Sequence, residues 1–69
     1  MSIEKNYLKN LRALRIRKGW TQEKLAQEAG ISYHTLIKIE RGNIKDPRLG
    51  TLLKIAAALA VPIEKLINN

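Results

Sequence analysis

The chain has 69 residues, 45% of them hydrophobic, no cysteine, and a net charge of +7 from thirteen Lys and Arg against six Asp and Glu. This length allows one domain, residues 1–69, and the lack of cysteine excludes disulfides and thiolate metal sites. The first ten residues carry charges and lack an apolar signal-peptide core, and the run 55–63 is too short to span a bilayer, so we expect a cytoplasmic protein without a membrane partner. The positive charge favours a polyanionic partner, although a generically basic surface would carry the same charge.

The first predicted helix covers residues 2–18. Its apolar stripe recurs at helical spacing, at Tyr7, Leu8, Leu11 and Leu14. Ser2 is the expected N-cap, and Gly19 is expected to end the helix after two basic residues that suit its C-terminal dipole.

Two short helical patterns follow, about three residues apart. Thr21 is the expected N-cap of the second helix, although Glu23 lies one position short of a capping box. Gly30 is expected to end it in a left-handed conformation. Ser32 is expected to cap a third helix over 33–41, which Gly42 ends. The inward residues of both helices are expected to be Leu25, Ala26, Ala29, Leu36 and Ile39. Two short helices joined by a turn containing glycine predict a helix-turn-helix, a pattern that other αα-corners share.

The remaining chain continues the helical pattern. A polar connection over 43–47 precedes a fourth helix over 48–60, and Pro62 suits the first turn of a short fifth helix over 63–67. No stretch alternates with period two long enough to predict a strand. The sequence therefore predicts an all-α domain of five helices.

Several motifs occur in a fixed order along the chain: LRALR (11–15), GWTQEKLA (19–26), GIS (30–32), IERG (39–42) and PRLGTLLKIAAAL (47–59). Together they resemble the phage repressor and Cro-type (XRE-type) helix-turn-helix family over about residues 7–66. The resemblance implies a compact repressor-type fold that binds double-stranded DNA with its third helix in the major groove. The familiar Gln near the start of the third helix is replaced here, which leaves the preferred DNA sequence open.

The first turns of the third helix supply the expected base contacts, which are Tyr33, His34, Thr35 and Lys38. Tyr33 has the alternative of packing against the second helix, and His34 that of a solvated side chain. Ile37 lies off the apolar face, where it would touch DNA, touch a partner or stand exposed. A single histidine predicts no metal site.

A second group is expected at the DNA backbone. By resemblance, Gln22 and the amides of the second helix hold a phosphate. The other expected phosphate contacts are Arg15, Arg41, Asn43, Lys45 and Arg48, for which the alternative is a solvated basic loop. The resemblance also implies an ion pair between Arg15 and Glu40, which makes Glu40 structural. Trp20 is expected in the core.

The C-terminal helix offers Ile63, Leu66 and Ile67, which are expected either to form a dimer contact or to complete the core of the monomer. A two-fold dimer would place two third helices about one DNA turn, roughly 34 Å, apart on a palindrome.

The sequence thus predicts a sequence-specific DNA-binding regulator of transcription that acts at an operator, with no catalysis, no cofactor and no small-molecule effector. The chain shows no acid–base pair, phosphate-binding glycine loop or metal-ligand cluster. Two alternatives stay open: an antitoxin or restriction-modification controller of the same fold, and a protein-interaction module with a basic surface.

Overall fold

The structure is a computed structural model that describes residues 3–44 and 47–67, with side chains over residues 10–44 and 47–66. The helices, in chain order, are α1 (Ile3–Arg17), α2 (Gln22–Ala29), α3 (Tyr33–Glu40), α4 (Leu49–Ala58) and α5 (Glu64–Ile67). The described ranges contain no strand, which confirms the prediction of an all-α fold with five helices. None of the helices in these ranges is long and apolar enough to cross a membrane.

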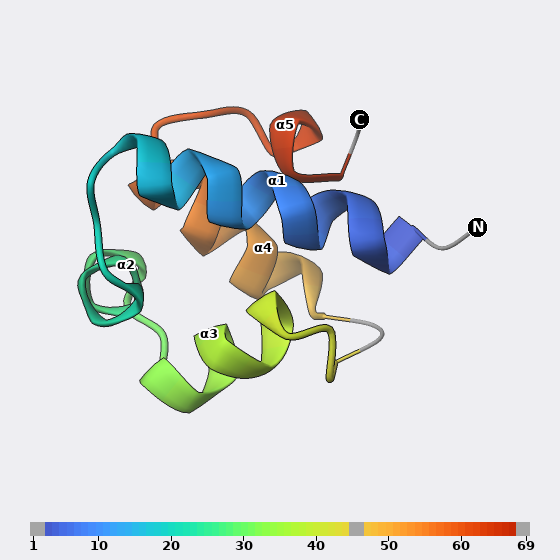
Figure 1. The fold of residues 1–69 in the computed structure, drawn as a ribbon, viewed down its shortest axis with the longest axis horizontal. Helices are drawn as coiled ribbons and strands as arrows, with labels where there is room; N and C mark the ends of the chain where they lie inside the picture. Colours follow the sequence, from blue (N-terminus) through green and yellow to red (C-terminus); the bar gives the residue numbers. More distant parts are fainter. Residues whose placement is uncertain (1–2, 45–46, 68–69) are drawn as a thin grey trace.

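The longest helix, α1, crosses the middle of Figure 1 with α5 above it and α3 below it. α1 contacts α5 and α3, and α2 contacts α3 and α4. α2 is seen nearly along its axis while α3 runs across the lower edge, so the two helices meet at a steep angle (Figure 1). This corner leaves the outer side of α3 uncovered.

The core is formed by one set of side chains drawn from every helix. Its five completely buried members are Leu11, Leu25, Leu36, Ile55 and Leu66. The small residues Ala26 and Ala29 on α2 belong to the same cluster, and they allow α2 to approach its neighbours closely. The inward faces predicted for α2 and α3 are therefore confirmed.

Four helices end in the same hydrogen-bond pattern. In each, a residue one or two positions after the helix has a positive φ, at Gly19 (74°), Gly30 (70°), Gly42 (76°) and Ala60 (58°). The N–H of that residue bonds three residues back, and the next N–H bonds five residues back, as Gly30 N does to Gln27 O (3.2 Å) and Ile31 N to Ala26 O (3.0 Å). This Schellman pattern pairs carbonyls that the helix end would leave free.

Some helix boundaries differ from the prediction. α3 begins at the predicted residue and ends one residue early, because Arg41 is its C-cap. α4 begins one residue late, because Arg48 is an extended N-cap with φ −65° and ψ 141°, and ends two residues early. α4 stops before Ala60 because the left-handed backbone at Ala60 cannot continue a right-handed helix. The expected cap Ser2 lies outside the described residues.

Candidate functional site

The turn between α2 and α3 is set by its capping residues. Thr21 Oγ1 accepts a hydrogen bond from Lys24 N (3.0 Å), and Ser32 Oγ accepts one from Thr35 N (3.0 Å). Both caps satisfy amide groups that have no partner within their helix. The reciprocal half of a capping box is absent on α2 because Lys24 occupies the third helical position. With Gly30 in the left-handed conformation, these bonds fix where α3 begins.

The inner side of α3 is held by a buried carboxylate. Glu40 accepts from Arg15 Nε (2.7 Å), from Arg15 Nη2 (3.2 Å) and from Gln22 Nε2 (2.9 Å). The side chains of Arg15 and Glu40 are only 11% and 4% exposed. Arg15 Nη1 also donates to the backbone carbonyl of Trp20 (2.9 Å), so this network joins α1, α2 and α3. The ion pair expected between Arg15 and Glu40 is present.

The outer side of α3 carries polar side chains of a different kind. Tyr33, His34 and Lys38 are exposed, and Thr35 is half-buried. The rings of Tyr33 and His34 are tilted by 51°, with centroids 6.2 Å apart. Tyr33 is 42% exposed, which disfavours the alternative of packing fully against α2. Thr35 Oγ1 accepts from Ser32 Oγ (2.8 Å) and keeps its own hydroxyl proton for another partner.

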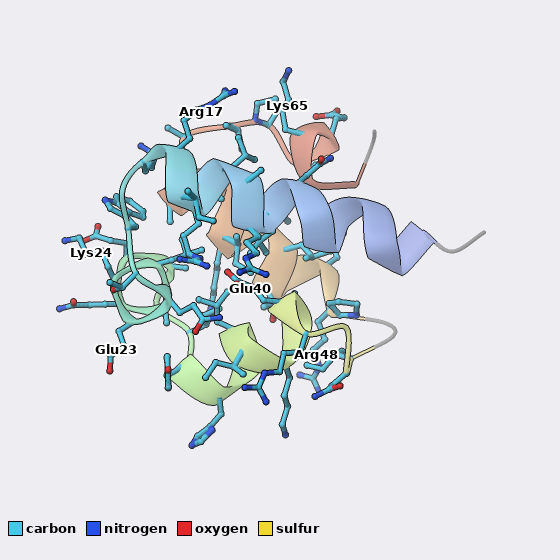
Figure 2. The ribbon with its side chains drawn as sticks, viewed as in Figure 1. Arg17, Glu23, Lys24, Glu40, Arg48 and Lys65 are labelled. Carbon is cyan, nitrogen blue, oxygen red and sulfur yellow. The ribbon has the colours of Figure 1, made fainter. Side chains whose placement is uncertain are left out.

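Cationic and polar side chains continue from α3 into the next connection. Arg41, Asn43 and Arg48 are exposed, and Figure 2 labels Arg48, which directly precedes α4. Lys45 lies outside the described residues. The only acid of α3, Glu40, points inward to Arg15, so it adds no free negative charge to this surface. Cations with a buried, neutralised acid produce a positive surface that attracts phosphate.

Two expected phosphate contacts are already engaged within the protein. Gln22 gives one amide proton to Glu40 and is half-buried, so its second amide proton and its carbonyl stay available. Arg15 makes three hydrogen bonds and is nearly covered, which assigns it mainly to holding α3. Contact of either residue with phosphate stays a prediction.

The residues expected to form a dimer contact differ in how deeply the structure buries them. Leu66 is completely buried in the core, so it stabilises the monomer and is not a surface residue. Ile63 is half-buried against the same core, and the side chain of Ile67 is outside the described set. Within the described side chains, the large aliphatic ones that stand exposed are Ile16 on α1 and Leu49 and Leu53 on α4. The sequence did not predict their exposure, because leucine and isoleucine are among the residues most often buried.

Sequence reasoning missed two contacts around Trp20. The ring is half-buried against the core instead of being fully inside it, and Lys18 Nζ and Lys24 Nζ lie 5.0 and 5.9 Å from its centroid. Cations at this distance are attracted by the ring quadrupole. The hydrogen bond from Gln22 to Glu40 was also missed, because eighteen residues separate the two along the chain. No cluster of three or more His, Asp or Glu that could hold a metal occurs within the described part of the chain.

Comparison with known proteins agrees with this geometry. Residues 11–66 match a family model described as "Helix-turn-helix" (HTH_3). The chain is 45% identical over 62 residues to the uncharacterized HTH-type transcriptional regulator MJ0272 of Methanocaldococcus jannaschii, covering 90% of this chain and 88% of that protein. It is 41% identical over 58 residues to the HTH-type transcriptional regulator SutR of Escherichia coli, covering 84% of this chain and 32% of that protein.

A solved structure extends the likeness to three dimensions. The crystal structure of the hypothetical transcription factor NHTF from Neisseria matches with a TM-score of 0.90 and 32% identity, over 96% of this chain and 75% of that chain. Relatives differ in length: this chain spans 32% of SutR, 41% of the Bacillus subtilis regulator RghRB and 54% of a hypothetical transcription factor of Neisseria meningitidis. The shared part includes the α2–α3 corner and both capped turns described above.

Proposed function

We propose that this chain, which belongs to the helix-turn-helix family of DNA-binding transcriptional regulators, is a cytoplasmic protein. It occupies a specific operator and thereby regulates transcription. In this proposal α3 lies in the major groove, and a homodimer binds an inverted repeat. The observation that carries the proposal is the division of α3 into two faces. Its acid is buried in an ion pair, and its cation and hydrogen-bonding groups are exposed.

Base recognition is assigned to the exposed residues of α3. Lys38 is suited to donate to O6 and N7 of guanine, and Thr35 to touch a thymine methyl group or a phosphate. Tyr33 and His34 stand one turn nearer the start of α3, where a helix-turn-helix approaches base edges. Ile37 is half-buried and is left out of this set.

Backbone contacts are assigned to the residues that flank α3. These are Gln22, Arg41, Asn43 and Arg48. Lys45 and Arg15 are also included as phosphate contacts, as the sequence predicts. Gln22 has a particular geometry, because one amide proton holds Glu40 while the other is free to meet a phosphate at the start of α2. A phosphate at this point would also meet the positive end of the helix dipole.

Selection from a random pool of duplex DNA, near physiological salt, tests this function. An enriched inverted repeat with half-sites about 10 base pairs apart is the expected result. Enrichment of a single half-site would retain the role of α3 and discard a stable dimer. Binding that is salt-sensitive but indifferent to sequence would reduce the interaction to charge alone and refute operator recognition.

A further inference from the structure

A groove lies between α1 and α5. Its volume is about 470 Å³, and its described lining comes from residues 10–17 of α1 and from residues 62–65. Asn10 Nδ2 donates to the backbone carbonyl of Lys65 (2.9 Å), so a hydrogen bond joins the two walls. Figure 1 shows α5 on one side of α1 and α3 on the other. We call this feature the α1–α5 groove.

Two free cations border the α1–α5 groove. Arg17 and Lys65 are exposed, and neither side chain makes an ion pair or hydrogen bond with another described residue. Figure 2 shows both side chains pointing away from α3, so the DNA surface assigned above does not use them. These cations are therefore available to an anionic partner other than the operator.

The floor of the groove is apolar. It is formed by Leu14, which is half-buried against the core, and by Ala13 and Pro62, which are exposed. These side chains offer no hydrogen bond, and an apolar group that covers them is stabilised by leaving water. An apolar floor beside two cations fits a ligand that combines an apolar side chain with carboxylates.

The remaining lining favours a peptide over other occupants. Glu64 also borders the groove, and its carboxylate repels the regularly spaced phosphates of a nucleic acid, whereas a peptide offers backbone N–H groups that it accepts. A small molecule is disfavoured because most of the lining residues are exposed and would not enclose it. A second copy of this chain is disfavoured by its own charge of +7.

We propose that the α1–α5 groove docks an acidic segment of another protein. One carboxylate of the segment pairs with Arg17, whose guanidinium binds a carboxylate through two parallel hydrogen bonds, and a second pairs with Lys65. An apolar side chain between the two acids covers Leu14. This proposal goes beyond operator binding: with α3 in the major groove the α1–α5 groove stays uncovered, so one molecule holds DNA and the acidic segment together.

The size and exposure of the groove predict weak binding. A segment of a few residues buries far less than the roughly 800 Å² that each partner contributes to a stable interface. Both ion pairs would also be exposed to solvent, where they contribute little and are screened by salt. We therefore expect a Kd near the millimolar range that rises with salt concentration.

Titration of the free, isotope-labelled chain, followed by the NMR resonances of its amides, tests the site. The probe is the acetylated and amidated peptide Ser-Glu-Leu-Glu-Ser, with Ser-Gln-Leu-Gln-Ser as the neutral control. At low salt the acidic peptide should shift residues 10–17 and 62–65 most, and the neutral peptide should bind at least about fivefold more weakly. Equal binding of the two peptides, shifts centred on α3, or no shifts at all would overturn the proposal.

Charge-removing variants separate the groove from the basic surface as a whole. Arg17→Gln/Lys65→Gln should weaken binding of the acidic peptide by about tenfold or more. Arg12→Gln/Lys54→Gln is the matched control, since it removes two exposed cations that do not line the groove, and it should bind within about twofold of wild type. Equal losses in the two variants would assign the binding to net charge and overturn the site.

A substitution in the floor gives an independent readout. Ala13→Glu adds bulk and a like charge at an exposed helix position, so it should abolish peptide binding with little change in the urea midpoint, whereas Ala57→Glu, on α4, should retain binding. Retained binding in Ala13→Glu would overturn the site. Ala13→Glu should also weaken binding to the selected duplex no more than Ala57→Glu does, because a larger loss would place nucleic acid in the groove. The peptide titration uses free protein, so a failure of operator selection would refute the proposed function alone.

Discussion

Replacing Glu40 by alanine should destabilise the fold far more than removal of an exposed charge. The substitution removes three hydrogen bonds and leaves the guanidinium of Arg15, in a side chain only 11% exposed, without its counter-charge. Breaking a buried ion pair by removing one partner costs about 3–5 kcal/mol. A domain of 69 residues has a total stability of about 3–10 kcal/mol, so Glu40→Ala should be marginally folded.

Urea unfolding, followed by Trp20 fluorescence and by helical circular dichroism, measures this loss. Glu28→Ala is the matched control because it removes an equivalent carboxylate from the exposed pair with Lys24, whose side chains are 47% and 43% exposed. That pair contributes about 0.3–0.5 kcal/mol. A Glu40→Ala variant that loses less than about 1 kcal/mol, similar to Glu28→Ala, would refute the argument from burial.

A double variant separates the charge from the packing. Arg15→Met/Glu40→Leu removes both charges while keeping apolar volume, and replacement of a whole buried pair is often close to neutral. It should therefore be more stable than Glu40→Ala by about 2 kcal/mol. If the double variant is as unstable as the single one, the cost lies in lost hydrogen bonds, such as the Gln22–Glu40 bond that both variants lack, instead of in an unpaired charge.

Further predictions concern one helix end, one cap and two proposed DNA contacts. Ala60→Gly should raise the free energy of unfolding by about 0.5–1 kcal/mol because it relieves the left-handed backbone at φ 58°, and a lower urea midpoint would contradict this. Ser32→Ala should lower it by about 1 kcal/mol through loss of the bond from Thr35 N, which the same titration measures. Lys38→Ala should change the preferred base at one position by about 1–3 kcal/mol, as scored by binding to single-base variants of the selected site. Arg41→Ala should weaken binding to all sequences and flatten the salt dependence by about one unit, and unchanged affinity in both variants would refute the placement of α3 in the groove.

Local sequence determined much of this fold. Thr21, Ser32, Gly19, Gly30 and Gly42 each act within a few residues, so the starts of α2 and α3 were predictable, and their ends to within one residue. The end of α4 was not, because an alanine occupies the position that glycine fills in the other three helices. Its left-handed backbone accompanies the hydrogen bond from Val61 N to Ala56 O, which no local sequence pattern predicts.

The candidate site divides in the same way. The exposed residues of α3 could be named from the helix-turn-helix pattern, since they occupy the first turns of its second helix. Long-range contacts could not be derived by spacing alone, and the Gln22–Glu40 bond was missed entirely. The burial of Leu66 depends on how α5 packs against α1, so its removal from the dimer surface required the structure.

α3 is fastened at both ends, by the Ser32 cap at its start and by the bonds of Glu40 at its last residue. Among the side chains on its outer face, only that of Thr35 bonds to an anchor, through Ser32 Oγ. The others that would read DNA, Tyr33, His34 and Lys38, can therefore be exchanged while the rotation of the helix about its own axis stays fixed. New target preferences then become accessible by substitutions that leave folding intact, so related proteins can diversify what they bind on an unchanged frame.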